Sequence, residues 1–231
     1  MHPKTSTERL VPGAIVMQIS LGVRERRETA MIKVYGTSVS GNCHKVRMVL
    51  EALHLPYAWN EIDSSKGETR TPEFLARNAN GKVPVVELEA GVYLPESNAI
   101  ICYLADGSPL MPDDRLLRAR VLAWLFFEQY SHEPYIAVAR FLCRFHPDPP
   151  SQRALVESKM PGGYRALEVI EKALADAPFL VGGRYTIADI GLYAYTHVAD
   201  EGGFDLARFP AIRSWLSRVA AQPGYVAMVV P

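Results

Sequence analysis

The stretch Lys82-Val83-Pro84-Val85-Val86, followed after a short interval by Pro95-Glu96-Ser97-Asn98-Ala99-Ile100, decides the fold. Apolar and acidic residues alternate over 86–89, which is the period of a half-buried strand. Ala90-Gly91 supplies a turn, and residues 92–94 return as a second short strand. Ser97 then begins an apolar helix, whose first backbone N–H groups point outward and favour an anion. The stretch therefore predicts a hairpin that leads into a helix.

The segment upstream of this hairpin adds two strands and two helices. Residues 32–35 predict a strand, 37–42 a polar loop, and 43–53 a helix with one apolar face. A second strand follows over 56–62, and a second helix begins near Thr71. The predicted order of elements is therefore β-α-β-α-β-β-α.

These motifs, in this order and spacing, resemble the cytosolic glutathione transferases, in particular bacterial serine-type enzymes of the theta, delta and zeta kind. The resemblance covers roughly residues 31–225 and rests on three segments: Ser40-Gly41-Asn42-Cys43-His44-Lys45-Val46-Arg47, Asn78-Ala79-Asn80-Gly81-Lys82-Val83-Pro84, and Glu96-Ser97-Asn98-Ala99-Ile100. It implies a thioredoxin-like N-terminal α/β domain, an all-helical C-terminal domain, glutathione as co-substrate, and a homodimer.

We expect four parts along the chain. Residues 1–30 show no clear period, and we interpret them as a dispensable N-terminal extension whose deletion leaves folding and activity intact. The thioredoxin-like domain spans 31–106, a Gly- and Pro-containing linker spans 107–113, and the helical domain spans 114–231.

The helical half carries its own local signals. Pro134 is expected to kink or interrupt a long helical tract that 146–150 ends, and Pro210 suits the first position of the last helix. Thr186-Ile187-Ala188-Asp189 has the spacing of a capping box, with Asp in place of the usual Glu.

Composition excludes several classes of function. The chain has 231 residues, of which 48% are apolar, and its 25 basic and 25 acidic residues give no net charge. This balance argues against a nucleic-acid or anionic-membrane partner, and no apolar run approaches the roughly 20 residues that span a bilayer. Three cysteines without a Cys-x-x-Cys motif and six scattered histidines predict a reducing, cytoplasmic location and no metal site.

The loop before the first predicted helix is where an activating group for the glutathione thiol is expected. A free thiol has a pKa of about 8.5, so presenting it as a thiolate at neutral pH requires a nearby donor. By resemblance to the serine-type classes, Ser40 carries that hydroxyl, although it also suits the helix cap. Ser38 and Thr37 are the nearest competitors, and Tyr35 stands where the tyrosine-type classes place theirs.

Cys43 supports a different chemistry. At the first turn of a helix we expect its pKa to be lowered, and by resemblance to beta- and omega-like transferases it would act in glutathione-dependent thiol-disulfide reduction. A non-catalytic, transferase-like binding protein is the other alternative. Zeta-type isomerisation is less favoured, because Ser40-Gly41-Asn42 departs from the zeta Ser-Ser-Cys pattern.

The resemblance also implies a set of glutathione ligands. Glu96 would bind the γ-glutamyl ammonium and Ser97 the α-carboxylate, while the backbone of Val83, before Pro84, would pair with the cysteinyl part. Lys82 would meet the glycyl carboxylate. The site of the small hydrophobic electrophile, which such an enzyme would conjugate in detoxification, is less determined, and Tyr130 and Tyr135 are its candidates.

Overall fold

A four-stranded mixed sheet is the centre of the first domain. The structure, a computed structural model, describes residues 31–145 and 150–229, so the predictions for 1–30 and 146–149 lie outside the described residues. The strands are β1 (Ile32–Gly36), β2 (Tyr57–Glu61), β3 (Val85–Glu89) and β4 (Val92–Pro95), and they lie in the order β2-β1-β3-β4. β1 pairs parallel with β2 and antiparallel with β3, and β3 pairs antiparallel with β4. The predicted thioredoxin-like arrangement is confirmed.

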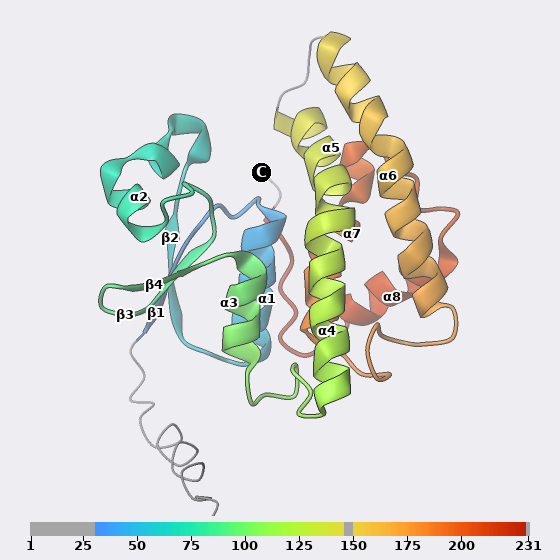
Figure 1. Ribbon diagram of the computed structural model, residues 1–231, viewed down its shortest axis with the longest axis horizontal. Helices are drawn as coiled ribbons and strands as arrows, with labels where there is room; N and C mark the ends of the chain where they lie inside the picture. The colour runs from blue at the N-terminus through green and yellow to red at the C-terminus, as the bar shows by residue number, and fades with distance from the viewer. Residues whose placement is uncertain (1–30, 146–149, 230–231) are drawn as a thin grey trace, which may run out of the picture. The chain divides into compact units, whose positions relative to one another are not determined.

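Helices cover both faces of this sheet (Figure 1). α1 (Gly41–Ala52) and α3 (Ser97–Ala105) lie side by side on one face, and α2 (Pro72–Arg77) lies on the other, after the single turns η1 (Ser64–Lys66) and η2 (Glu68–Arg70). Val34 and Val86, paired across β1 and β3, are fully buried. Tyr35, one residue on from Val34, has the guanidinium of Arg77 4.4 Å above its ring, so it belongs to the α2 face.

The first helix begins two residues earlier than the sequence pattern indicates. Ser40 has an extended backbone, and its side chain accepts a hydrogen bond from the backbone N–H of Cys43 at 3.4 Å. This is the geometry of an N-cap, so the helix starts at Gly41. The apolar pattern could not show it, because Gly41 and Asn42 are not apolar.

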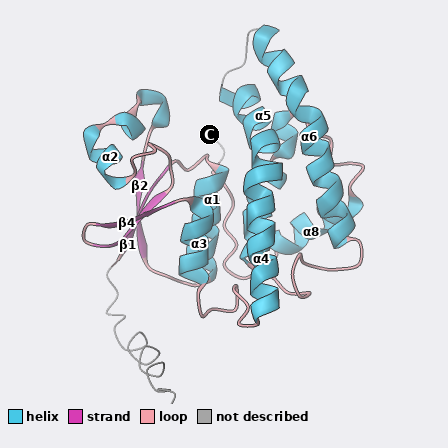
Figure 2. Ribbon diagram, in the orientation of Figure 1, coloured by secondary structure: helices cyan, strands magenta, loops and turns pink. Residues whose placement is uncertain are grey.

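The second domain is entirely helical, as Figure 2 shows by colour. Its elements are α4 (Arg115–Phe127), η3 (Glu128–His132), α5 (Glu133–Phe145), α6 (Pro150–Leu174), α7 (Ile187–Thr196), η4 (Ala199–Gly202) and α8 (Pro210–Ala220). η3 is a turn of π-helix that separates α4 from α5 immediately before Pro134. Pro134 is the second residue of α5, so the helical tract continues through it, and the irregularity is the π-turn that precedes it. π-Helical turns of this kind occur frequently at functional sites. No helix within the described ranges is both long enough and apolar enough to cross a bilayer.

The predicted capping box at the start of α7 is present and extends further than the sequence indicates. Thr186 and Asp189 cap each other's backbone N–H groups, and the Asp189 carboxylate also accepts from Leu180 N and from the buried Trp215 indole, both at 3.0 Å. The box therefore fixes α7 against α8, and α7 in turn packs along α1 of the first domain.

Candidate functional site

The loop over residues 37–40 brings three hydroxyl groups to the start of α1, and two of them hold the loop in place. Thr37 Oγ1 donates to the carbonyl of Ile62 at 2.6 Å, and Ser38 Oγ donates to Glu61 at 2.9 Å. Ser40 is half-buried, and its hydroxyl oxygen lies at the N-terminus of the helix. Of the three, Ser40 is the hydroxyl that the fold does not use to tie the loop to β2.

The prediction of a lowered pKa for Cys43 is wrong. Its side chain is fully buried, and its Sγ accepts a hydrogen bond from the Thr37 backbone N–H at 3.3 Å. Burial raises the pKa of the Cys43 thiol to about 12, although hydrogen bonds from Ser40 and Thr37 act in the opposite direction. A thiol in this environment is a packed core group and not a nucleophile.

Tyr35 is committed to another partner. Its hydroxyl donates to Glu87 at 2.9 Å, and burial together with this hydrogen bond raises the pKa of Tyr35. The carboxylate of Glu87 also lies 3.4 Å from the ammonium of Lys33. The phenol therefore belongs to a polar cluster on the α2 face of the sheet.

The N-terminus of α3 is the second component of the site. Ser97 is buried, while Glu96 is exposed and has a φ of +70°, an uncommon conformation for a non-glycine residue. No side chain caps α3 within the described part of the chain, so its first N–H groups are open to a ligand.

The Val83–Pro84 peptide bond is cis, a point that the sequence left open. The backbone N–H and C=O of Val83 have no backbone partner among the described residues. Lys82 beside it is exposed.

Asn42 joins the N-termini of α1 and α3, a role that the sequence did not reveal. Its side-chain oxygen accepts from Ser97 Oγ at 3.2 Å, and its side-chain nitrogen donates to Glu133 Oε1 at 3.1 Å. Gln129 holds the other carboxylate oxygen of Glu133 at 2.7 Å. The starts of α1, α3 and α5 thus meet through one amide.

A buried ion pair lies directly behind this junction. Lys45 Nζ is 2.7 Å from Glu128 Oε2, 3.3 Å from Asn98 Oδ1 and 3.5 Å from Ser97 Oγ. The side chains of Lys45 and Glu128 are both fully buried. Because α1 supplies one charge and η3 the other, this pair crosses from the first domain to the second.

Arg140 of α5 fixes the loop from the other side. Its Nη1 donates to the carbonyl of Val39 at 3.0 Å, and its Nε donates to Glu201 at 2.8 Å. Arg140 thus forms a salt bridge with Glu201. The residue directly before Ser40 is therefore anchored to the second domain.

The two candidate electrophile residues lie elsewhere. Tyr130 is 85% exposed on the outer side of η3. The ring of Tyr135 packs against Gly162 of α6, where an added Cβ would come within 2.1 Å of it. Tyr135 is two residues from Glu133, which contacts Asn42, so the two side chains leave α5 in nearly opposite directions. Tyr135 lines a cavity among α4, α5 and α6, and neither tyrosine lies at the junction of Asn42 and Ser97.

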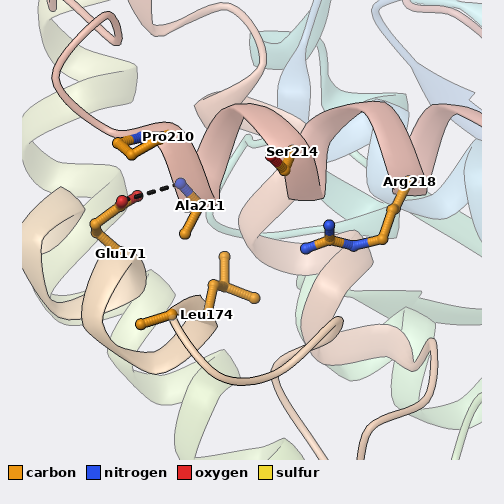
Figure 3. A pocket seen from close by; sticks show the side chains of 7 residues that line it. Glu171, Leu174, Pro210, Ala211, Ser214 and Arg218 are labelled. Carbon is orange, nitrogen blue, oxygen red and sulfur yellow. Dashed lines mark hydrogen bonds between the residues drawn. The ribbon is translucent and has the colours of Figure 1, made fainter.

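Two cavities lie away from this junction, and the first of them has a structural explanation. A groove of about 450 Å³ lies between α6 and α8 (Figure 3), where Glu171 accepts from the backbone N–H groups of Ala211 and Ile212 at 2.9 and 2.8 Å. The carboxylate thereby caps the N-terminus of α8. A smaller cavity of about 220 Å³ lies beside Tyr135 among α4, α5 and α6. The described residues contain no cluster of three metal-ligating side chains.

Comparison with known proteins identifies the family. The model of the glutathione S-transferase N-terminal domain matches residues 39–106, and that of the C-terminal domain matches residues 126–223. The chain belongs to the glutathione S-transferase family. It is 30% identical to the disulfide-bond oxidoreductase YfcG of Escherichia coli K12, over 79% of this chain and 87% of that protein.

Solved structures agree with this assignment. A glutathione S-transferase from Pseudomonas fluorescens Pf-5 is 54% identical with a TM-score of 0.85, covering 87% of this chain and all of that one. Ure2p in complex with glutathione is 28% identical with a TM-score of 0.76, covering 84% of this chain and 90% of the other. The family thus includes transferases and at least one protein named for disulfide chemistry.

Proposed function

We propose that this protein is a serine-type glutathione transferase, which binds glutathione as a thiolate and conjugates it to a small electrophile. The observation that carries the proposal is the meeting of the α1 and α3 N-termini through Asn42 and Ser97, with the Ser40 hydroxyl at the start of α1. Each helix N-terminus carries partial positive charge, so the junction favours a ligand with more than one anionic group.

The ligand-binding residues that fit glutathione come from both sides of the hairpin. Ser97 and the uncapped N–H groups of α3 suit the α-carboxylate, and exposed Glu96 suits the ammonium beside it. The unpaired backbone of Val83 suits the cysteinyl peptide, and Lys82 suits the glycyl carboxylate. A related structure, Ure2p, holds glutathione, which supports the same ligand here.

Ser40 is the proposed thiol-activating group. Its hydroxyl oxygen accepts from the Cys43 backbone N–H, so its hydrogen is left to rotate toward an acceptor, and a neutral thiol is only a weak one. A thiolate is a far better acceptor, because the hydrogen bond to it is charge-assisted. Lowering a thiol pKa by about 2 units needs about 2.7 kcal/mol, which one charge-assisted hydrogen bond of about 1.5–3 kcal/mol and a helix N-terminus can supply.

The test is an ultraviolet difference titration of bound glutathione against pH. We expect the thiolate of glutathione on the wild-type protein to appear about one to three pH units below that of free glutathione, and Ser40→Ala to remove most of this shift. Ser38→Ala is the matched control, since its hydroxyl already binds Glu61, and it keeps the shift. An unshifted thiol on the wild-type protein contradicts the proposal.

Glutathione-dependent disulfide reduction is a second candidate, favoured by the similarity to YfcG. The same thiolate would attack a disulfide, form a mixed disulfide and release one thiolate. A second glutathione would then release the other thiolate and leave oxidised glutathione. Since Cys43 is buried, this route would not use it. Comparing turnover of an aryl halide with that of a small dialkyl disulfide separates the two functions.

A homodimer is also part of the proposal. Leu116, Phe126 and Tyr130 follow one another along the outer side of α4 and η3 and are 59%, 71% and 85% exposed. Such a row of exposed apolar side chains suits a second copy of this chain. By light scattering we expect a dimer for the wild type and a monomer for Phe126→Glu, whereas Leu155→Glu, at an exposed apolar position on α6, leaves the dimer intact. A monomeric wild type at micromolar concentration refutes this part.

A further inference from the structure

The buried pair of Lys45 and Glu128 has a geometry that structural stabilisation alone does not require. Removing two charges from water costs more than their attraction returns in many proteins, and apolar residues of similar size often serve as well. Here one oxygen of the pair, Glu128 Oε1, is buried without a hydrogen-bond partner among the described residues. If the pair served stability alone, replacing both residues by apolar ones would leave the protein as stable or make it more stable.

The orientation of the Lys45–Glu128 ion pair relative to the start of α3 points to a role in binding. Lys45 Nζ lies between Glu128 on one side and the first two residues of α3, Ser97 and Asn98, on the other. Glu128 accepts from Asn98 Nδ2 through Oε2 at 2.9 Å and has no hydrogen bond to Ser97 within the described part of the chain. The two charges therefore form a dipole whose positive end is the one nearer to Ser97.

The ammonium also determines what the Ser97 hydroxyl can do. An ammonium group only donates hydrogen bonds, so Ser97 Oγ accepts from Lys45 and has to donate its own hydrogen elsewhere. At present that hydrogen goes to Asn42 Oδ1. An incoming carboxylate would take it instead, as the stronger acceptor.

We propose that Lys45, held by Glu128, is a positioning residue for the glutathione α-carboxylate. It keeps Ser97 as an outward donor and places a buried positive charge behind it. The inference rests on the proposed function, because it assigns the α-carboxylate of glutathione to Ser97.

The same pair connects this subsite with the second domain. Glu128 begins the π-helical turn η3, and Asn98 Nδ2 also donates to the carbonyl of Leu125 in α4 at 3.1 Å. The position of Lys45 is therefore set from the helical domain, although Lys45 belongs to the first domain. Residues of both domains thus define the carboxylate subsite.

The test uses calorimetric titration with two ligands on the full chain. One is glutathione and the other is its analogue without the α-carboxylate, 4-aminobutanoyl-cysteinyl-glycine. We expect the double variant Lys45→Met/Glu128→Leu to weaken glutathione binding by about tenfold or more, as for a lost charge-assisted contact, and to change binding of the analogue by less than about twofold.

The matched control removes the exposed pair Asp106 and Arg118, which likewise joins the first domain to the second but lies at the far end of α3. We expect Asp106→Asn/Arg118→Met to bind both ligands like the wild type. Equal losses for both ligands in the Lys45/Glu128 variant would assign the pair a purely structural role and overturn the inference. Failure of the wild type to bind glutathione would instead overturn the proposed function, and this inference with it.

A measurement on the wild-type protein covers the case in which the double variant does not fold. The ¹⁵N resonance of the Lys45 ammonium should shift when glutathione binds and remain in place when the analogue binds. An equal response to the two ligands contradicts the role proposed for Lys45.

Discussion

The pair Lys45–Glu128 predicts a characteristic pattern of stability across four proteins: the wild type, Lys45→Met, Glu128→Leu and the double variant. In Lys45→Met the Glu128 carboxylate stays buried with Asn98 as its single remaining partner. In Glu128→Leu the ammonium keeps only its longer contacts, to Asn98 at 3.3 Å and Ser97 at 3.5 Å. Each single variant thus leaves an uncompensated buried charge.

The expected magnitudes follow from that burial. Both side chains are 0% exposed, so each single substitution should cost about 3–5 kcal/mol of unfolding free energy. The double variant removes both charges and should lie within about 1 kcal/mol of the wild type. The coupling energy between the two sites is then about 5 kcal/mol or more in magnitude.

Urea unfolding followed by circular dichroism at pH 7.5 measures these differences, provided that the slope of free energy against urea is the same in all four proteins. The exposed pair Asp106–Arg118 is the control, and its removal should cost less than about 1 kcal/mol. Additive costs, with the double variant as unstable as the sum of the singles, would refute the reasoning.

Two further predictions concern groups whose protonation the fold controls. Cys43 should resist alkylation in the native protein at pH 8 while the exposed Cys143 reacts, because burial raises the pKa of Cys43 to about 12. Mass spectrometry of the labelled protein measures this, and rapid labelling of Cys43 contradicts the prediction. Burial lowers the pKa of His132 from 6.5 to about 3, so the unfolded state binds the proton first and stability falls as the pH drops below 6.5. Between pH 6.5 and 4 the loss of unfolding free energy due to His132 amounts to about 3 kcal/mol. His132→Leu should reduce the measured loss over this range by that amount, and an unchanged loss refutes the prediction.

Local chemistry was enough to predict much of the fold. The hairpin, the helix start at Ser97 and the capping box at Thr186 each depend on a few neighbouring residues, and each is confirmed. The start of α1 was placed two residues late because a cap depends on a hydrogen bond and not on apolar period.

The junction at the candidate site could be predicted only in part. Lys45 stands four residues before Val49, and Glu128 three residues after Leu125, so both charges occupy apolar stripes of their helices, a signal that the sequence offered. The ion pair between them could not be predicted from the sequence, because the two residues are 83 positions apart.

The expected pKa of Cys43 failed for a related reason. The first turn of a helix lowers a thiol pKa, but desolvation in a closed core is the larger effect, and burial is a property of the whole fold. The contact of Tyr135 with Gly162 of α6 could not be predicted either, because helical spacing shows which residues share a side and not which neighbour that side contacts.

The contacts of the second domain with the start of α1 determine whether the thioredoxin-like domain can be used without the helical one. The ring of Tyr195 in α7 lies so close to Gly41 that an added Cβ would come within 2.6 Å of it. Arg140 holds the carbonyl of Val39, and Glu128 neutralises Lys45. Cutting the chain after residue 106 would remove the contacts that hold the residues on either side of Ser40, and it would expose the buried Lys45. The thioredoxin-like half and the helical half therefore have to be transplanted or redesigned as one piece.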